Sequence, residues 1–174
     1  MMPNIKLEHK FDPIKYRHYL NNNLTVLHCH HYATLFTQLA IDAKDIVDGT
    51  RILIETAEDV FYKLLSDYYV MYNCTEVTDK IEIAVKMFSA IGMGKMNLIS
   101  VNETNAEIEL PFAYLDEGWM QKWGKSDFSV NFIARGYIAG MFSAIFGKPV
   151  RTYNTVELQS IVTGAEKSII KITM

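Results

Sequence analysis

The feature that most constrains the fold is an apolar helix, expected over residues 128–146, with two glycines in its interior. Gly136 and Gly140 stand about one turn apart in this stretch. Each costs a helix about 1 kcal/mol relative to alanine, so a strand, a helix or a ligand is expected to approach that side closely. Asn131 and Arg135 interrupt the run, and a membrane span needs about 20 apolar residues. The stretch therefore predicts a buried helix.

Length and composition predict one domain over residues 1–174. The chain is 49% hydrophobic and 21% charged, and a chain of this length buries roughly two thirds of its unfolded surface. Its formal net charge is −3 and no basic run occurs, which argues against nucleic acid as a partner. Cys29 and Cys74 lack CxxC spacing, and the first residues lack the layout of a signal peptide. We expect a reduced, cytoplasmic protein.

Three helices are expected before the sheet. A short β-prone run over residues 24–27 leads into a helix at a histidine cluster. The apolar stripe of this helix is Tyr32, Leu35, Phe36, Leu39, Ala40 and Ala43. Asp48-Gly49-Thr50 ends the first helix and begins a second, which runs to about Tyr72. Thr78 is the expected N-cap of the third helix, and Gly92 ends it.

Two β-hairpins flank the apolar helix. The hydrophobic period changes to two from Lys95, residues 102–105 supply turn chemistry, and residues 106–110 alternate between apolar and acidic. A short helix carrying both tryptophans is expected within residues 112–125. Alternation returns over residues 150–155 and 169–172. The predicted fold is α/β (α+β): an antiparallel sheet with a helical layer, in the order three helices, hairpin, long apolar helix, C-terminal hairpin.

The last third of the chain carries spaced motifs. They are Gly136-Tyr137-x-x-Gly140, Gly147-Lys148-Pro149-Val150, Glu157 and Gly164. The set resembles the 4-vinyl reductase type of small-molecule-binding domain, within the hydrocarbon-binding and TRAPP-like superfamily. The resemblance covers residues 119–174, and upstream only the element order is similar. It implies an α/β pocket for a small ligand and a homodimer.

Three positions depart from that family's pattern. Asn131, Ser160 and Ser168 stand where the family has cysteines. Thiolates are soft ligands suited to zinc, whereas hydroxyl and amide groups bind such a metal poorly. We therefore expect no cysteine zinc site.

His28-Cys29-His30-His31 holds three of the five histidines. Imidazole is the commonest transition-metal ligand. A continuing strand would place His28 and His30 on one face, whereas a helix would pair His28 with His31. The histidines could be locally satisfied, could contact a ligand, or could bind metal or haem. No second cluster supplies further metal ligands, so we expect no metal site; if one exists, it uses His28, His30 and His31.

Carboxylates offer a second set of candidates. Glu55, Glu58 and Asp59 lie on one predicted helix, where two could pair for proton transfer. Asp59 and Lys63 are four residues apart and off the apolar stripe, which is typical of a solvated ion-pair face, and we prefer that interpretation. Cys29 is interpreted as an inert thiol rather than an activated one.

These observations favour a non-catalytic binding or carrier protein, or a sensor, for a small apolar or aromatic ligand in an internal pocket. Aromatic residues with a polar group can stack on a flat ligand and donate a hydrogen bond. The candidate ligand-binding residues are His28, His30, His31, Tyr32, Phe36, Trp119, Trp123 and Tyr137. No catalytic constellation is complete, so an enzyme is not favoured. The alternatives are a small enzyme or haem/metal protein using residues 28–31, and a structural subunit of a larger assembly.

Overall fold

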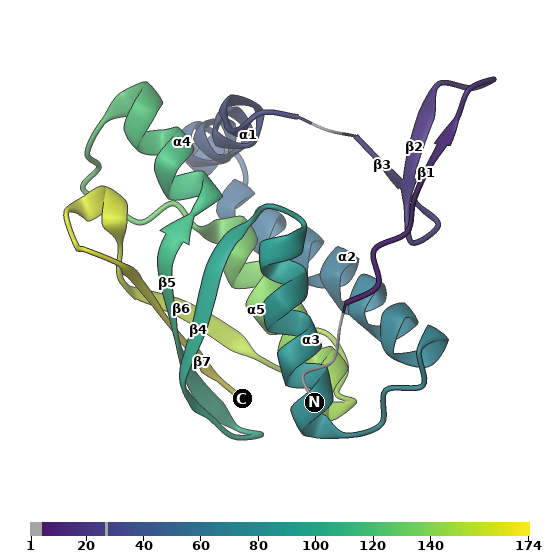
Figure 1. Cartoon of the computed structure of the whole chain (residues 1–174). Helices are drawn as coiled ribbons and strands as arrows, with labels where there is room; N and C mark the ends of the chain where they lie inside the picture. The colour runs from purple at the N-terminus through teal and green to yellow at the C-terminus, as the bar shows by residue number, and fades with distance from the viewer. Residues whose placement is uncertain (1–4, 27) are drawn as a thin grey trace.

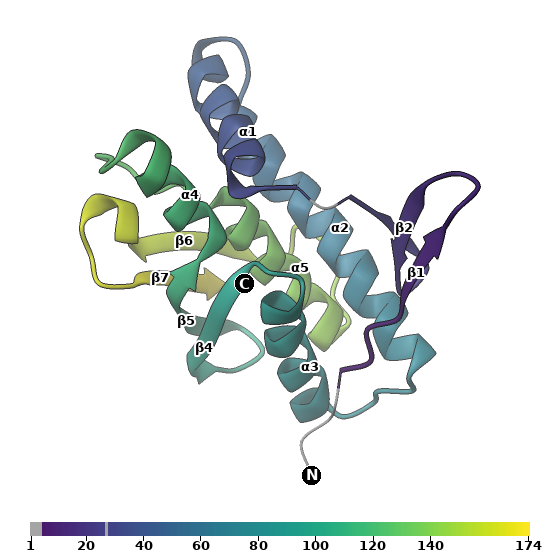
Figure 2. The ribbon, with the colours of Figure 1, turned by 45° about the horizontal axis from the view of Figure 1, so that its top comes forward.

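An N-terminal ribbon stands apart from the rest of the molecule. The computed structural model describes residues 5–26 and 28–174. Strands β1 (His9–Asp12), β2 (Arg17–Leu20) and β3 (Asn23–Thr25) form a small antiparallel sheet in that order. The ribbon projects beside α2 and away from α1 (Figures 1 and 2). The sequence indicated only the last of these strands, and Leu27 of the predicted run lies outside the described residues.

Three helices follow, as predicted. They are α1 (His30–Asp42), α2 (Gly49–Met71) and α3 (Val77–Ala90), with a short 3-10 turn, η1 (Ala43–Asp45), after α1. Asp48 caps α2, because its side chain accepts a hydrogen bond from the Arg51 backbone N–H. The prediction of Thr78 as N-cap was wrong. Helix α3 begins two residues earlier, at Val77, with Glu76 as an extended N-cap whose side chain makes no capping bond.

The main sheet has four antiparallel strands. They are β4 (Gly94–Val101), β5 (Asn105–Ala113), β6 (Asn154–Gln159) and β7 (Ser168–Thr173), in the order β4-β5-β7-β6. The expected alternation in β5 is confirmed, since Ala106, Ile108 and Leu110 are buried. Strand β6 begins later than predicted. Arg151 adopts a left-handed backbone (φ 68°), which breaks an extended run from residue 150.

Helices α4 (Tyr114–Trp123) and α5 (Phe132–Phe146) connect the two hairpins, and the 3-10 turn η2 (Ile161–Thr163) joins β6 to β7. Helix α5 packs along α2 and is buried along most of its length. The close neighbour of its two glycines is a helix. A Cβ at Gly140 would lie 2.6 Å from the Glu58 carbonyl oxygen, and one at Gly136 would lie 2.6 Å from the Ala57 Cβ. The absence of side chains at these two glycines therefore allows α2 and α5 to cross closely.

The core lies between the sheet and α2, α3 and α5. Its largest fully buried side chains include Phe88, Tyr137, Ile138, Met141 and Phe142. Within the described ranges 5–26 and 28–174, no helix has the length and apolar character needed to cross a membrane.

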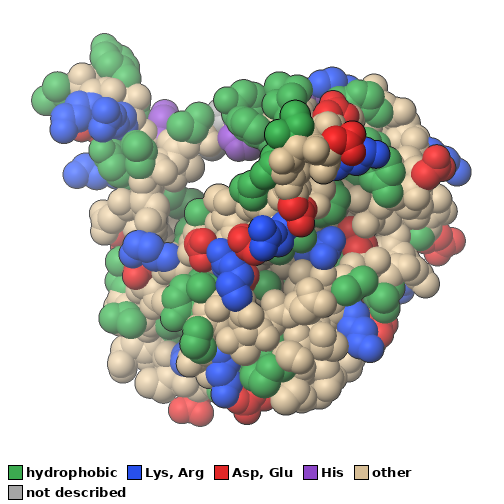
Figure 3. All heavy atoms as spheres, turned by 180° about the vertical axis from the view of Figure 1, so that it is seen from behind, with side chains coloured by type: hydrophobic (Ala, Val, Ile, Leu, Met, Phe, Trp, Pro, Cys, Tyr) green, Lys and Arg blue, Asp and Glu red, His purple; other side chains and the backbone are tan. Residues whose placement is uncertain are grey.

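The predicted apolar stripe of α1 is largely exposed, contrary to expectation. Tyr32, Leu35, Phe36 and Leu39 are 52%, 41%, 46% and 52% exposed. The buried residues of α1 are small instead: Ala33, Thr34 and Thr37. They allow α1 to approach α4 closely, since a Cβ at Gly118 would lie 2.8 Å from Thr34 Cγ2. Figure 3 shows hydrophobic side chains gathered along the upper edge of the molecule and on the part that projects beside it.

Candidate functional site

The junction of α1 and α4 brings together several of the residues singled out in the sequence. Helix α1 starts at His30, and the absence of a side chain at Gly118 lets α4 pass close to the His30 ring. A Cβ at Gly118 would lie 3.0 Å from His30 Cβ and Cδ2. Tyr114, one helical turn before Gly118 on α4, contacts His30 edge-on, with its ring centroid 6.2 Å from that of His30.

The three histidines occupy different environments. His28 and His31 are exposed, whereas His30 is half-buried. His28 Nδ1 lies 3.3 Å from the Tyr114 hydroxyl. The Nε2 atom of His30 is buried and makes no hydrogen bond within the described part of the chain. The sequence predicted that His28 shares a face with either His30 or His31. The structure shows neither arrangement, because His30 is the one of the three histidines that turns inward.

The two tryptophans pack against one another in the second half of α4, with their ring planes tilted by 44°. Their ring centroids are 4.6 Å apart, and Phe128 lies edge-on to Trp119 at 6.0 Å. Trp119 is 4% exposed and packs with Val130 and Val162, whereas Trp123 is 37% exposed. The indole N–H of Trp119 is buried without a hydrogen-bond partner among residues 5–26 and 28–174. Such a group normally finds an acceptor, so its lone N–H is a candidate ligand contact.

The remaining candidates separate into an exposed pair and a core residue. Tyr32 and Phe36 pack edge-on, 4.9 Å between centroids, on the exposed face of α1. Tyr137 is fully buried between Phe61 and Phe88, and its hydroxyl donates to the Ala84 carbonyl oxygen at 2.6 Å. Burial raises the pKa of Tyr137 well above its ordinary value. Its hydrogen-bonding group is therefore occupied by the protein itself.

A buried polar cluster beside α4 was not predicted as a site. Asn131 Nδ2 donates to Asp116 Oδ1 at 2.9 Å and to Glu157 Oε1 at 2.9 Å, and the Ser168 hydroxyl donates to Asp116 Oδ2 at 2.9 Å. Asp116, Asn131 and Ser168 are fully buried. Three oxygens, Asn131 Oδ1, Glu157 Oε2 and Ser160 Oγ, have no partner within the described ranges.

The pKa of Asp116 is raised from 3.8 to about 6. Burial is the main cause, because it penalises the ionised carboxylate, and the negative charges of Glu157 and Glu117 add to it. The hydrogen bonds donated by Asn131 and Ser168 oppose this rise. One signal in the sequence could have indicated this cluster: Asn131, Ser160 and Ser168 stand where the 4-vinyl reductase pattern, which the sequence resembles, has cysteines.

The interpretation of Glu55, Glu58 and Asp59 as a solvated face is wrong for Glu58. Its carboxylate is 2% exposed and accepts hydrogen bonds from the Arg151 backbone N–H at 2.6 Å and from Arg151 Nη1 at 2.9 Å. Asp59 is exposed and also pairs with Arg151, at 2.8 Å. Arg151 is 93 positions from Glu58, so helix spacing alone could not reveal the pair.

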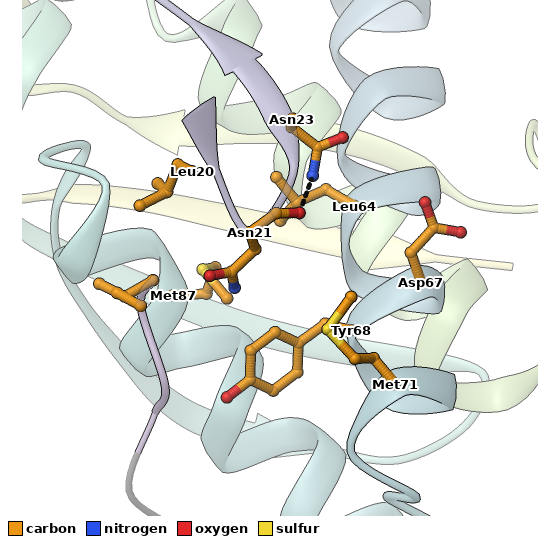
Figure 4. Close-up of a pocket in the computed structure, with 9 residues that line it drawn as sticks. Leu20, Asn21, Asn23, Leu64, Asp67, Tyr68, Met71 and Met87 are labelled. Atoms are coloured by element: carbon orange, nitrogen blue, oxygen red, sulfur yellow. Dashed lines mark hydrogen bonds between the residues drawn. The ribbon is translucent and has the colours of Figure 1, made fainter. Parts of the chain in front are cut away.

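Hollows formed by the described residues lie away from the indoles. The first lies between the ribbon and α2, where Leu20, Leu64, Tyr68 and Met71 approach one another (Figure 4). Its volume of about 20 Å³ accommodates little more than one water molecule. The second is an open polar cleft of about 430 Å³ between α2, α5 and the residues before β6. Neither is lined by Trp119 or Trp123.

Within residues 5–26 and 28–174, no three His, Cys, Asp or Glu side chains are grouped so as to hold a metal ion. Among these residues, the histidine cluster therefore lacks the further ligands that a protein metal site requires.

The fold is similar to that of two solved proteins. The phenol-responsive sensory domain of the transcription activator PoxR, solved with phenol, matches with a TM-score of 0.79 and 14% identity, over 95% of this chain and 84% of that one. A trafficking protein particle complex subunit 3 from Naegleria fowleri, covalently bound to palmitic acid, matches with a TM-score of 0.56 and 17% identity, over 82% of this chain and 89% of that one. No family model and no curated protein matches the chain.

These likenesses define the class of fold. The chain has the α+β fold shared by a phenol-responsive sensory domain and a TRAPP subunit, and the predicted helical layer with its C-terminal hairpin is confirmed. At 14% and 17% identity the comparisons concern the fold, and the ligand must be argued from this chain's own residues.

Proposed function

We propose that the protein is a non-catalytic binding domain of the 4-vinyl reductase type, acting as a carrier or sensor for a small aromatic molecule with one polar group. The PoxR sensory domain and the TRAPP subunit were solved with phenol and with palmitic acid respectively, which supports a small, largely apolar ligand. The motifs at Gly136, Tyr137 and Gly140 support the family. A reduced, cytoplasmic setting is consistent with two free cysteines, Cys29 and Cys74.

The observation that carries this proposal is a pair of buried ring nitrogens at the α1–α4 junction, His30 Nε2 and Trp119 Nε1, which have no hydrogen-bond partner among the residues that the structure describes. An indole N–H can only donate, whereas an imidazole nitrogen donates or accepts according to its tautomer. A buried polar group without a partner costs about 1–3 kcal/mol, which a ligand hydroxyl would recover by hydrogen bonding. A phenolic hydroxyl has both the donor and the acceptor needed.

The apolar part of the ligand would lie against the neighbouring rings. Trp123 and Phe128 contact the ring of Trp119, and Tyr114 contacts the ring of His30. His28, His31, Tyr32 and Phe36 would line the entrance, since they are exposed on the adjoining part of α1. Neither described cavity lies here, so binding requires side chains at the α1–α4 junction to move. Tyr137 is left out of this proposal because its hydroxyl is already bonded.

Isothermal titration calorimetry with phenol, anisole and toluene tests the proposal. Phenol is expected to bind most tightly, because anisole lacks the hydroxyl proton and toluene lacks both donor and acceptor. His30→Ala and Trp119→Phe should each weaken phenol binding about tenfold, or about 1.4 kcal/mol. The Trp119→Phe change keeps an aromatic ring and removes the N–H.

His9→Ala is the matched control, because His9 is an exposed histidine on strand β1 of the ribbon and lies outside the α1–α4 junction. It should change phenol binding little. Equal binding of phenol and toluene, or equal losses in the His30 and His9 variants, would contradict the assignment of His30. Absorption spectra and metal analysis of the purified protein address the rival haem or metal protein, for which a stoichiometric chromophore or metal would be the decisive result.

We also propose a homodimer formed through the exposed apolar face of α1. Tyr32, Leu35, Phe36 and Leu39 form this face, and such a patch on a soluble protein commonly marks an interface. A twofold dimer would place the same patch of both copies together. Light scattering should give twice the monomer mass, and Leu35→Glu with Leu39→Glu should give a folded monomer. A monomeric wild type, or a stable complex with a different protein through this face, would favour the structural-subunit alternative.

A further inference from the structure

The open polar cleft of about 430 Å³ shares no residue with the α1–α4 junction. One side is formed by residues 48–58 at the start of α2, and the other by Arg135 of α5 and residues 151–155 before and within β6. Charged side chains of both signs gather across the middle of the molecular face in Figure 3. The cleft is therefore suited to a polar ligand rather than to an aromatic hydrocarbon.

The carboxylates that line the cleft are already paired with two arginines. Arg151 contacts Glu58 at 2.9 Å and Glu55 at 3.9 Å. Arg51 contacts Asp48 at 3.6 Å and Glu55 at 3.7 Å. Arg51 and Arg151 thus form ion pairs with all three carboxylates that line the cleft.

Arg135 is the lining cation that remains outside these pairs. Its Nε and Nη2 donate to one acceptor, the Thr155 carbonyl oxygen, at 3.1 and 2.5 Å. In the part of the chain that the structure describes, no carboxylate lies within 4 Å of its guanidinium nitrogens. No hydrogen bond from its Nη1 group is found there, and the central carbon of the guanidinium lies over the Phe132 ring, 5.8 Å from the ring centroid.

The environment of Arg135 makes an unpaired charge costly. The residue is half-buried, and burial lowers the pKa of its guanidinium, although the negative charge of Glu157 opposes that shift. A guanidinium stays protonated in proteins, so the cost of burial has to be offset by a partner. Its planar array of N–H groups matches the oxygens of a carboxylate or a phosphate.

We propose that this cleft binds a small oxyanion, a carboxylate or a phosphate, held by the free N–H groups of Arg135. The bonds to Thr155 hold the guanidinium plane in place, and the Arg151 pairs keep Glu55 and Glu58 from competing for Arg135. The protein would then bind a second, anionic class of ligand at a place distinct from the aromatic site.

Nuclear magnetic resonance of the side-chain Nε–H groups of arginine tests this directly. The full chain would be titrated with sodium phosphate and, separately, with sodium acetate, while sodium chloride keeps the ionic strength constant. A saturable shift of the Arg135 Nε–H signal and the Thr155 amide is expected with at least one of the two anions. Which anion saturates the signal distinguishes the carboxylate from the phosphate.

Arg135→Lys keeps the positive charge but loses the planar fork, and it should weaken binding at least about tenfold. Arg17→Lys is the matched control, because Arg17 is exposed on the ribbon, and it should leave binding unchanged. The proposal is overturned if the signals shift without saturation for both anions. It is also overturned if the two variants bind the responding anion equally.

Discussion

Replacing Asp116 by Asn should alter how the stability of the protein depends on pH. The pKa of Asp116 rises from 3.8 to about 6 in the folded protein, chiefly because the carboxyl group is buried. A rise of about two units corresponds to about 3 kcal/mol, since each unit is worth about 1.4 kcal/mol. The folded state holds this proton more tightly than the unfolded state does. The stabilisation is therefore complete below pH 3.8 and is lost as the pH rises through about 6.

Urea unfolding of the wild type and of Asp116→Asn, from about pH 4 to about pH 8, measures this effect. Asparagine has no titrating group, so the variant should not lose this stabilisation as the pH rises. The free energy of unfolding of the variant minus that of the wild type should rise by about 2.5 kcal/mol across the series, because a small part of the full effect is already lost at pH 4. Subtracting the two free energies of unfolding removes the contribution of titratable groups that both proteins share. A difference that is flat, or that falls with pH, would refute the raised pKa of Asp116.

Two further predictions concern the packing of α2. Gly140→Ala should destabilise the protein by about 1–3 kcal/mol in urea unfolding, because the added Cβ would lie 2.6 Å from the Glu58 carbonyl oxygen. A stabilised variant would contradict the close crossing of α2 and α5. Glu58→Gln should destabilise the protein by about 1–3 kcal/mol in the same assay, because it leaves the Arg151 contacts without their charged acceptor. Asp67→Asn, on the exposed side of α2, should destabilise it by less than about 1 kcal/mol. Equal losses of stability in the two variants would contradict the importance of the buried pair.

The elements with a clear hydrophobic period were predictable from the sequence. In β5, Ala106, Ile108 and Leu110 alternate with acidic residues, and all three face the core. Helix α2 likewise follows from Asp48 as its N-cap and from its apolar stripe. In these cases the local pattern and the tertiary packing agree, so periodicity was sufficient.

Helix α1 shows where that reasoning fails. Its period is helical, but its large residues, such as Phe36 and Leu39, point away from the body and its small ones, such as Thr34, are buried. A hydrophobic stripe predicts which face is covered but does not say whether the same chain covers it. The glycines of α5 were ambiguous for a related reason, since the spacing of Gly136 and Gly140 reveals a close neighbour without identifying it.

The polar cluster could not be assembled from local spacing. Asp116, Asn131, Glu157 and Ser168 come from α4, the start of α5, β6 and β7, and only the folded topology brings them together. The ribbon was missed because its strands have three or four residues each and are too short for a reliable period. His30 and Trp119, on which the proposed aromatic site depends, were both named from the sequence, and their role in binding stays a prediction.

The indole N–H signals of the two tryptophans, followed by nuclear magnetic resonance during titration with phenol, test the proposed binding function most directly. The Trp119 N–H is buried and has no hydrogen-bond partner in the described part of the chain, whereas Trp123 is partly exposed and provides an internal control. A saturable downfield shift of the Trp119 signal, larger than that of Trp123 and absent from Trp119→Phe, is the predicted result. Phenol that binds while the Trp119 signal stays in place, or that does not bind at all, would contradict the account.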